Sequence, residues 1–173
     1  MKTIETTVYE LDELNDTAKD RAREWYRSGA LDYEWWEFTY ADAESIGLKI
    51  TGFDLERSRH CKGKLVEDAC HCADKIIANH GEFSETVRLA EAFLRERDEI
   101  VTAAERDEDG ELTDERGLDC KLDDLESEFE RALLEEYAMI LDRERDYLLS
   151  DEQVDESIRC NEYTFTESGK REG

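Results

Sequence analysis

The 173-residue sequence has no proline, only three histidines and no long apolar run. Because proline breaks helices, its absence favours long uninterrupted helices. No window approaches the roughly 18 apolar residues that a membrane-spanning helix needs, so we expect no membrane segment. The first ten residues, MKTIETTVYE, lack the apolar core and cleavage site of a signal peptide. We therefore expect a cytoplasmic protein.

The usual motifs of catalysis are also missing. The sequence has no Gly-x-Ser-x-Gly motif and no glycine-rich phosphate loop. Carboxylates are so numerous that two of them lying close together says little about acid–base chemistry. We predict that the protein is not an enzyme and uses no cofactor. An enzymatic alternative would require His71 and His80 to converge with carboxylates in one pocket.

The five cysteines are an odd number in a chain without a secretion signal, which is typical of reduced thiols. Soft metal ligands gather in one short stretch: His60, Cys61, Cys70, His71 and Cys72. Their spacing does not match a standard zinc finger, and three consecutive helical residues point about 100° apart. We predict no metal site here, with Cys70 in the core, His71 in solvent and Cys72 half-exposed. A metal site at these residues stays an alternative.

Residues 105–116 partly fit the loop of a calcium-binding helix–loop–helix motif. Asp107, Asp109 and Gly110 fall at matching positions. Arg116, however, stands where a bidentate glutamate should bind the ion. A positive charge there opposes calcium binding, so the pattern favours a solvated acidic loop.

Charge is the most unusual property of the chain, which has 48 acidic and 23 basic residues and a net charge of −25. Such a charge repels nucleic acid and anionic membranes and attracts basic partners. Two alternatives explain acidity without a partner. It keeps a protein soluble, and it is typical of proteins from salt-loving cells, which often have fewer lysines than arginines, as this chain does (8 and 15).

The acidity is concentrated between residues 105 and 156, where 22 acidic residues accompany 6 basic ones. Most of this block has helical periodicity, with carboxylates three or four positions apart. Such pairs repel each other by a few tenths of a kcal/mol and lie about 5–6 Å apart, a spacing comparable to that of phosphates along a nucleic-acid strand. A rigid helix of this kind could imitate DNA toward a surface that binds phosphates.

Aromatic residues concentrate between residues 23 and 50, a segment that holds all three tryptophans. Large rings bury the most apolar area, so we expect the core to form around a helix spanning about 32–46. Trp35, Phe38 and Ile46 lie near one face of that helix, and Gly47 ends it.

Periodicity and capping residues predict the remaining elements. We expect strands at 2–9, 48–55 and 161–168, a short strand after a turn within 58–64, and helices at about 15–28, 66–80, 85–105, 118–149 and from Ser150. The predicted caps are Asn15 or Asp16 for the first helix, Ser84 for the helix at 85–105 and Ser150 for the last helix. Val66, Cys70 and Ile77 should face inward, and the chain should fray from Glu167 onward.

These elements predict an α+β fold that is predominantly helical. A small antiparallel sheet is packed by the aromatic-rich helix, and a long acidic helical extension follows. We expect an aromatic-cored domain at 1–105 and an acidic linker at 106–120. The remainder, 121–173, contains the long helix, a short helix and a final strand, and should pack back on the first part.

Three segments, LDYEWWEFTYADAESIGLKI, FDLER and NHGEFSET, resemble a family of small uncharacterised proteins encoded by bacteriophages and prophages. Some members carry an antitoxin-like label. The resemblance covers residues 1–100 and 145–168 but not the acidic stretch 102–120. It implies a phage gene product that acts in the cytoplasm of a bacterial host, and it supplies no catalytic residues.

Charge and resemblance together predict an acidic binding protein that inhibits a host nucleic-acid-binding defence complex, such as a CRISPR effector or a restriction enzyme, by imitating DNA. The partner would be a basic host protein or a nucleoprotein complex, with no direct binding of nucleic acid or membrane. The predicted partner-binding residues are the carboxylates of the long helix and its preceding loop: Asp107, Glu108, Asp109, Asp123, Asp124, Glu126, Glu128, Glu130, Glu135 and Glu136.

The alternative is an antitoxin-like or regulatory adaptor that binds a protein through an apolar groove beside the aromatic helix. Tyr33 or Tyr40 would then carry the contact, and charge changes on the long helix would leave binding intact. The apolar stripe of the long helix also leaves a homodimer open.

Overall fold

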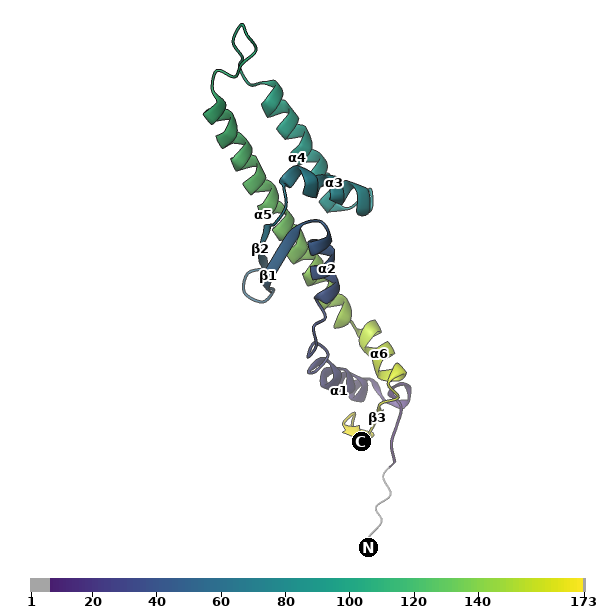
Figure 1. The fold of residues 1–173 in the computed structure, drawn as a ribbon. Helices are drawn as coiled ribbons and strands as arrows, with labels where there is room; N and C mark the ends of the chain where they lie inside the picture. Colours follow the sequence, from purple (N-terminus) through teal and green to yellow (C-terminus); the bar gives the residue numbers. More distant parts are fainter. Residues whose placement is uncertain (1–6, 173) are drawn as a thin grey trace. The chain divides into compact units, whose positions relative to one another are not determined.

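The computed structural model describes residues 7–172, which fall into two units (Figure 1). The terminal unit contains the residues up to Trp35 together with those from Arg143 onward, and the central unit is Trp36–Asp142. The fold is predominantly helical with small antiparallel sheets, as predicted. Among the described residues, none of the helices is long and apolar enough to cross a bilayer.

The terminal unit brings the two ends of the described chain together. It contains the 3₁₀ helix η1 (Leu11–Glu13), α1 (Asp16–Arg27), α6 (Asp151–Cys160) and the short strands β3 (Thr164–Phe165) and β4 (Arg171–Glu172). Two predicted caps begin its helices. The Asn15 side chain accepts a hydrogen bond from the amide of Ala18, and Ser150 accepts one from Gln153.

The core of the terminal unit consists of apolar side chains from its helices and β3: Leu11, Leu14, Ala18, Ala22, Val154, Ile158 and Phe165. Arg23 of α1 donates two hydrogen bonds of 2.7 Å to the carboxylate of Asp155 on α6. Both side chains are largely shielded from solvent, so this pair fixes one helix against the other.

The C-terminal end differs from the prediction. We expected fraying from Glu167, but Arg171–Glu172 forms β4, which pairs antiparallel with β3. The Arg171 guanidinium lies over the ring of Tyr163, 4.5 Å from its centroid, which holds the end of the chain against the unit. The strand predicted at 2–9 falls mostly outside the described residues, but Tyr9 forms a bridge with Phe165.

The central unit contains α2 (Glu37–Ser45), β1 (Leu48–Asp54), β2 (His60–Leu65), α3 (Ala69–Asn79), α4 (Glu85–Thr102) and most of α5 (Glu115–Leu148). β1 and β2 pair antiparallel with Leu48 opposite Leu65 and an irregularity between Ile50 and Gly52. The Ser84 side chain accepts a hydrogen bond from the Val87 amide and begins α4, as predicted.

The aromatic helix packs on the sheet as predicted, because the rings of Trp36 and Tyr40 meet the ring of Phe53 on β1. The same helix is nevertheless not the centre of the molecule. It begins at Glu37 instead of Asp32, and Phe38 is 88% exposed. Trp25 lies in the other unit, where its ring contacts Tyr163 and Phe165. The aromatic segment is therefore divided between two cores.

The 34-residue helix α5 supplies much of the central core. Leu125, Phe129, Leu133, Tyr137 and Leu141 recur every four residues along it and are buried. The Phe129 ring stacks on Phe93 of α4 with the ring centroids 4.4 Å apart. The long acidic helix is thus also a core element of the central unit.

The unit boundaries differ from the predicted domains. Residues 106–114 do not separate domains, because they form the turn between α4 and α5, both in the central unit (Figure 1). The chain passes between units after Trp35 and after Asp142 instead. The reason is that the final segment packs on α1, a long-range contact that composition does not reveal.

Candidate acidic interface

The ten predicted partner-binding carboxylates do not form one row. On an α-helix, residues three or four apart share a side. Asp123, Glu126 and Glu130 therefore lie on one side of α5, whereas Asp124, Glu128 and Glu135 lie on another. The helix therefore has two acidic sides. Between them, on the side that faces the core, lie its buried apolar side chains.

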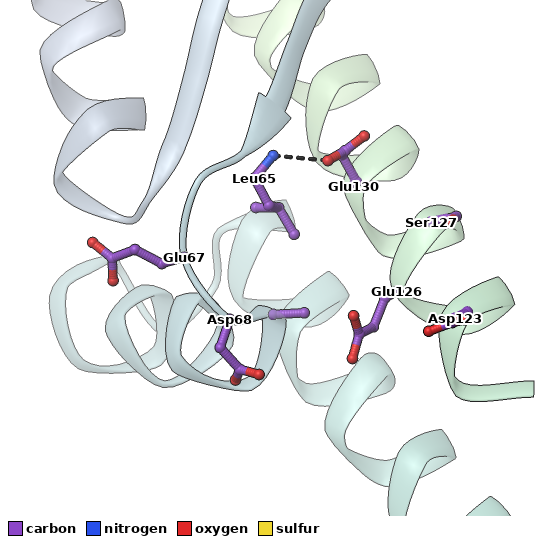
Figure 2. Close-up of a pocket in the computed structure, with 8 residues that line it drawn as sticks. Leu65, Glu67, Asp68, Asp123, Glu126, Ser127 and Glu130 are labelled. Atoms are coloured by element: carbon purple, nitrogen blue, oxygen red, sulfur yellow. Dashed lines mark hydrogen bonds between the residues drawn. The ribbon is translucent and has the colours of Figure 1, made fainter. Parts of the chain in front are cut away.

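The first side lines a groove of about 480 Å³ within the central unit (Figure 2). Its opposite wall is the segment between β2 and the first turn of α3, which contributes Leu65, Glu67, Asp68 and Ala69. Five of the eight residues that line the groove are carboxylates. This concave acidic surface, which we call the acidic groove, is the strongest candidate for binding a cationic side chain of a partner.

Glu130 fixes one end of the acidic groove. Its Oε2 atom accepts a hydrogen bond of 2.7 Å from the backbone amide of Leu65, the last residue of β2 (Figure 2). This carboxylate satisfies a donor at the end of a strand, and it ties the strand to α5. Glu130 is therefore a structural residue as well as a source of negative charge.

Glu126 extends from α5 toward the segment that carries Asp68 (Figure 2). Partial burial raises the pKa of this carboxyl, and the nearby charges of Asp68 and Asp123 raise it further, whereas Arg97 acts in the opposite direction. Ionisation of Glu126 is thus less favourable in the folded protein than in the unfolded chain. A cation bound in the acidic groove would relieve that repulsion.

Glu67 and Asp68 were not among the predicted residues. The side chain of Asp68 caps α3 by accepting hydrogen bonds from the amides of Cys70 and His71. Glu67 points away from α5 (Figure 2) and binds Lys75 Nζ at 2.7 and 2.8 Å, which lowers the pKa of Glu67. An aspartate before an alanine- and cysteine-rich helix is a capping signal, but no local pattern indicates that it faces a helix about 60 residues away.

The predicted loop residues Asp107, Glu108 and Asp109 are exposed. The Asp107 carboxylate stabilises the turn, because it accepts hydrogen bonds from the amides of Asp109 and Glu111. Arg106 donates a hydrogen bond to the carbonyl oxygen of Gly110. The acidic loop is therefore an ordered turn with its carboxylate groups on the outside.

The second side of α5 is exposed at Asp124, Glu128 and Glu135. Glu136 is an exception among the predicted residues, because it is only 8% exposed. It lies seven residues after Phe129 and one before Tyr137, which places it on the apolar stripe of the helix. The expected exposure of Glu136 is wrong, and the heptad spacing could have revealed this.

The cysteine–histidine stretch does not converge. Among residues 7–172, no group of three or more histidine, cysteine or acidic side chains could hold a metal ion. Cys72 is fully buried and Cys70 only partly so, which reverses our prediction. The reason is that α3 begins at Ala69, so that Ala69, Cys72, Ala73 and Ile76 form its inner side while Val66 and Ile77 are exposed.

The histidines have separate surroundings. His71 is exposed near Glu67, whereas the side chain of His80 is only 10% exposed. His80 Nδ1 lies 2.7 Å from the Thr86 hydroxyl, and Nε2 lies 3.6 Å from the Asp42 carboxylate. Asp42 also accepts a 2.7 Å hydrogen bond from Tyr137, so this network joins α2, α4 and α5.

Comparison with known proteins gives no family. The chain matches no protein-family model, no curated protein and no solved structure.

Proposed function

We propose that this chain is an acidic binding protein that inhibits a nucleic-acid-binding defence complex in a bacterial host by occupying its phosphate-binding surface. The partner is a basic protein or a nucleoprotein complex, and the inhibitor acts by stoichiometric binding without catalysis. The resemblance to phage-encoded proteins supports the bacterial host as the place of action. The negative charge of the chain supports a phosphate-binding surface as its target.

The single observation that supports the proposal best is the acidic groove. Its carboxylates come from two segments of the central unit, and the pKa of Glu126 is raised by burial and by its acidic neighbours. Glu67, Asp68 and Glu130 also have structural roles, so Asp123 and Glu126 are the carboxylates that we assign to the partner. A cationic side chain inserted there gains Coulomb energy and relieves existing repulsion.

The test uses charge-neutral variants of equal size. The purified protein is immobilised, bacterial lysate is passed over it at low and at high salt, and the captured complex is identified by mass spectrometry. The DNA binding of that complex is then measured with increasing amounts of the protein. Salt should weaken capture, because exposed charges are screened within about 8–10 Å.

Asp123→Asn with Glu126→Gln should weaken inhibition of DNA binding, since it removes two charges from the acidic groove. Glu152→Gln with Glu156→Gln is the matched control, because these exposed residues of α6 lie in the terminal unit. Inhibition that is equally strong at all salt concentrations, or equally affected by both pairs, would contradict the proposal.

One observation supports the alternative of a protein-binding adaptor. Phe38 is 88% exposed on α2, although a phenylalanine ring is usually buried. Of the tyrosines predicted for this role, Tyr33 is exposed and Tyr40 is partly buried beside Phe53. If Phe38→Ser abolishes capture of the partner and Asp123→Asn with Glu126→Gln leaves it intact, the adaptor is the better description.

A further inference from the structure

A second groove lies between α4 and α5, which run side by side in the central unit (Figure 1). Its volume is about 240 Å³. The apolar residues that line it come from successive turns of both helices: Leu89, Ala92, Phe93, Leu125, Phe129 and Ala132. The stacked rings of Phe93 and Phe129 form its floor, and both are nearly fully buried.

The small side chains of Ala92 and Ala132 open this groove. Ala92 directly precedes Phe93, and Ala132 lies three residues after Phe129. Both alanines are only half-buried. A larger side chain at either position would fill the space above the rings. The groove is therefore an unfilled position alongside two packed helices, a geometry that suits side chains from a third helix.

The remaining lining residues are Glu96 and Glu128, one from each helix, and both are exposed. Arg131 lies 3.3 Å from Glu128, but both side chains are 68% exposed, so this ion pair contributes little and is easily exchanged. A ligand with an apolar stripe and positive charges on both flanks would complement the floor and the rim together.

We propose that the α4–α5 groove binds a cationic amphipathic helix of a partner protein. The occupant is helical because the groove is bounded by helices whose backbone groups are already hydrogen-bonded, so recognition depends on side chains at helical spacing. It is cationic because of the glutamates on both rims. A second copy of this chain would bring its own net charge of −25, which opposes self-association at this site.

This surface is distinct from the acidic groove. Leu125, Phe129 and Ala132 lie on a different side of α5 from Asp123, Glu126 and Glu130, because the two sets are offset by one or two residues in the helical repeat. The inference goes beyond the proposed inhibition of DNA binding, and the two can fail separately.

The test uses a synthetic leucine–lysine peptide of about 18 residues with leucines at helical spacing of three and four. Its binding to the full chain is measured by fluorescence anisotropy. Two control peptides are measured in the same way. The first has the same composition but a scrambled order, so that the leucines lose their helical spacing. The second keeps the leucines in place and has glutamate instead of lysine. We expect the first peptide to bind and both controls to bind at least about tenfold more weakly.

Ala92→Leu with Ala132→Leu should weaken binding by about tenfold or more, because it fills the groove. Glu96→Gln with Glu128→Gln should weaken binding by roughly threefold, a change typical of exposed charges. Glu152→Gln with Glu156→Gln removes the same charge from α6 and should have no effect. Equal binding by all variants or by all three peptides would overturn the proposal.

A measurement on the unmodified chain covers the case in which the leucine variant fails to fold. Bound peptide should shift the methyl NMR signals of Ala92 and Ala132 and leave those of Ala18 and Ala22 in the terminal unit unchanged. Shifts confined to other methyl groups would overturn the proposal. Concentration-dependent dimerisation that competes with the peptide would do so as well, since the occupant would then be a second copy.

Discussion

At the scale of single residues, a substitution of Glu126 can show whether the carboxylates of the acidic groove repel one another in the folded protein. The folded state raises its pKa above the ordinary value of 4.5, through burial first and then through Asp68 and Asp123. The stabilising contribution of such a group is fully present below its unfolded pKa, where it is protonated, and is lost as the pH rises through the folded pKa.

Glu126→Gln should therefore raise the free energy of unfolding at neutral pH by a few tenths of a kcal/mol, as expected for a relieved like-charge contact. The difference from the original chain should disappear as the pH falls below about 4.5, because the carboxyl is then neutral in both states. Urea unfolding at several pH values measures this. A variant less stable than the original at neutral pH would show that Arg97 outweighs the two acidic neighbours.

The position before β1, occupied by Gly47, requires glycine for two reasons. Its φ is +84°, and an added Cβ would lie 2.8 Å from the sulfur of buried Cys72. Gly47→Ala should lower the free energy of unfolding by more than about 1–2 kcal/mol, since the strained conformation and the steric contact add together. Gly81→Ala is the control, because nothing lies within 4 Å of the Cβ that it would add. Equal effects of the two substitutions in urea unfolding would contradict this interpretation.

At the scale of elements, the most shielded ion pair between α1 and α6 is Arg23–Asp155, which accompanies more exposed pairs of Arg23 and Arg27 with Asp151 and the apolar core of the unit. Hydrogen bonds from Arg23 lower the pKa of Asp155. Asp155→Asn should reduce the free energy of unfolding by about 1–3 kcal/mol at neutral pH, because a shielded guanidinium loses its charged acceptor. Asp20→Asn is the control, since Asp20 also contacts Arg23 at 3.3 Å but is 71% exposed.

The pH dependence of this pair has the opposite sign to that of Glu126. A carboxyl with a lowered folded pKa contributes stability above its unfolded value and loses that contribution as the pH falls through the folded value. The difference between the original chain and Asp155→Asn should thus shrink below about pH 3.8, the ordinary value for aspartate. A difference that stays constant down to acidic pH would mean that packing, not charge, sets the effect.

At the scale of the whole molecule, a net charge of −25 opposes compaction. Sodium chloride should raise the free energy of unfolding at neutral pH, with most of the gain below about 0.5 M, because the screening length is already near 10 Å at 0.1 M. Thermal unfolding followed by circular dichroism measures this. A chain that folds only in molar salt would support salt adaptation as the reason for its acidity, and a stability that falls with salt would mean that the surface ion pairs dominate.

The sequence by itself determined most of the helices, the β1–β2 hairpin and their order, although not η1, β4 or the start of α2. Asn15, Ser84 and Ser150 cap their helices by accepting hydrogen bonds from the amides three residues later, and the buried apolar positions of α5 repeat every four residues. These signals are local, so a short window contains both partners of each interaction. The net charge is likewise a sum over residues, independent of the fold.

Only the tertiary structure decided which side chains share a site. Asp68 lies near Glu126 because the end of β2 is tied to α5 by the hydrogen bond from the Leu65 amide to Glu130, and no short window of sequence includes both segments. Burial of Glu136 and Cys72 depends on the side of a helix that meets its neighbours. The division of the aromatic segment between two units follows from the C-terminal end packing on α1. Contacts between distant segments set these outcomes, and they arise only when the whole chain folds.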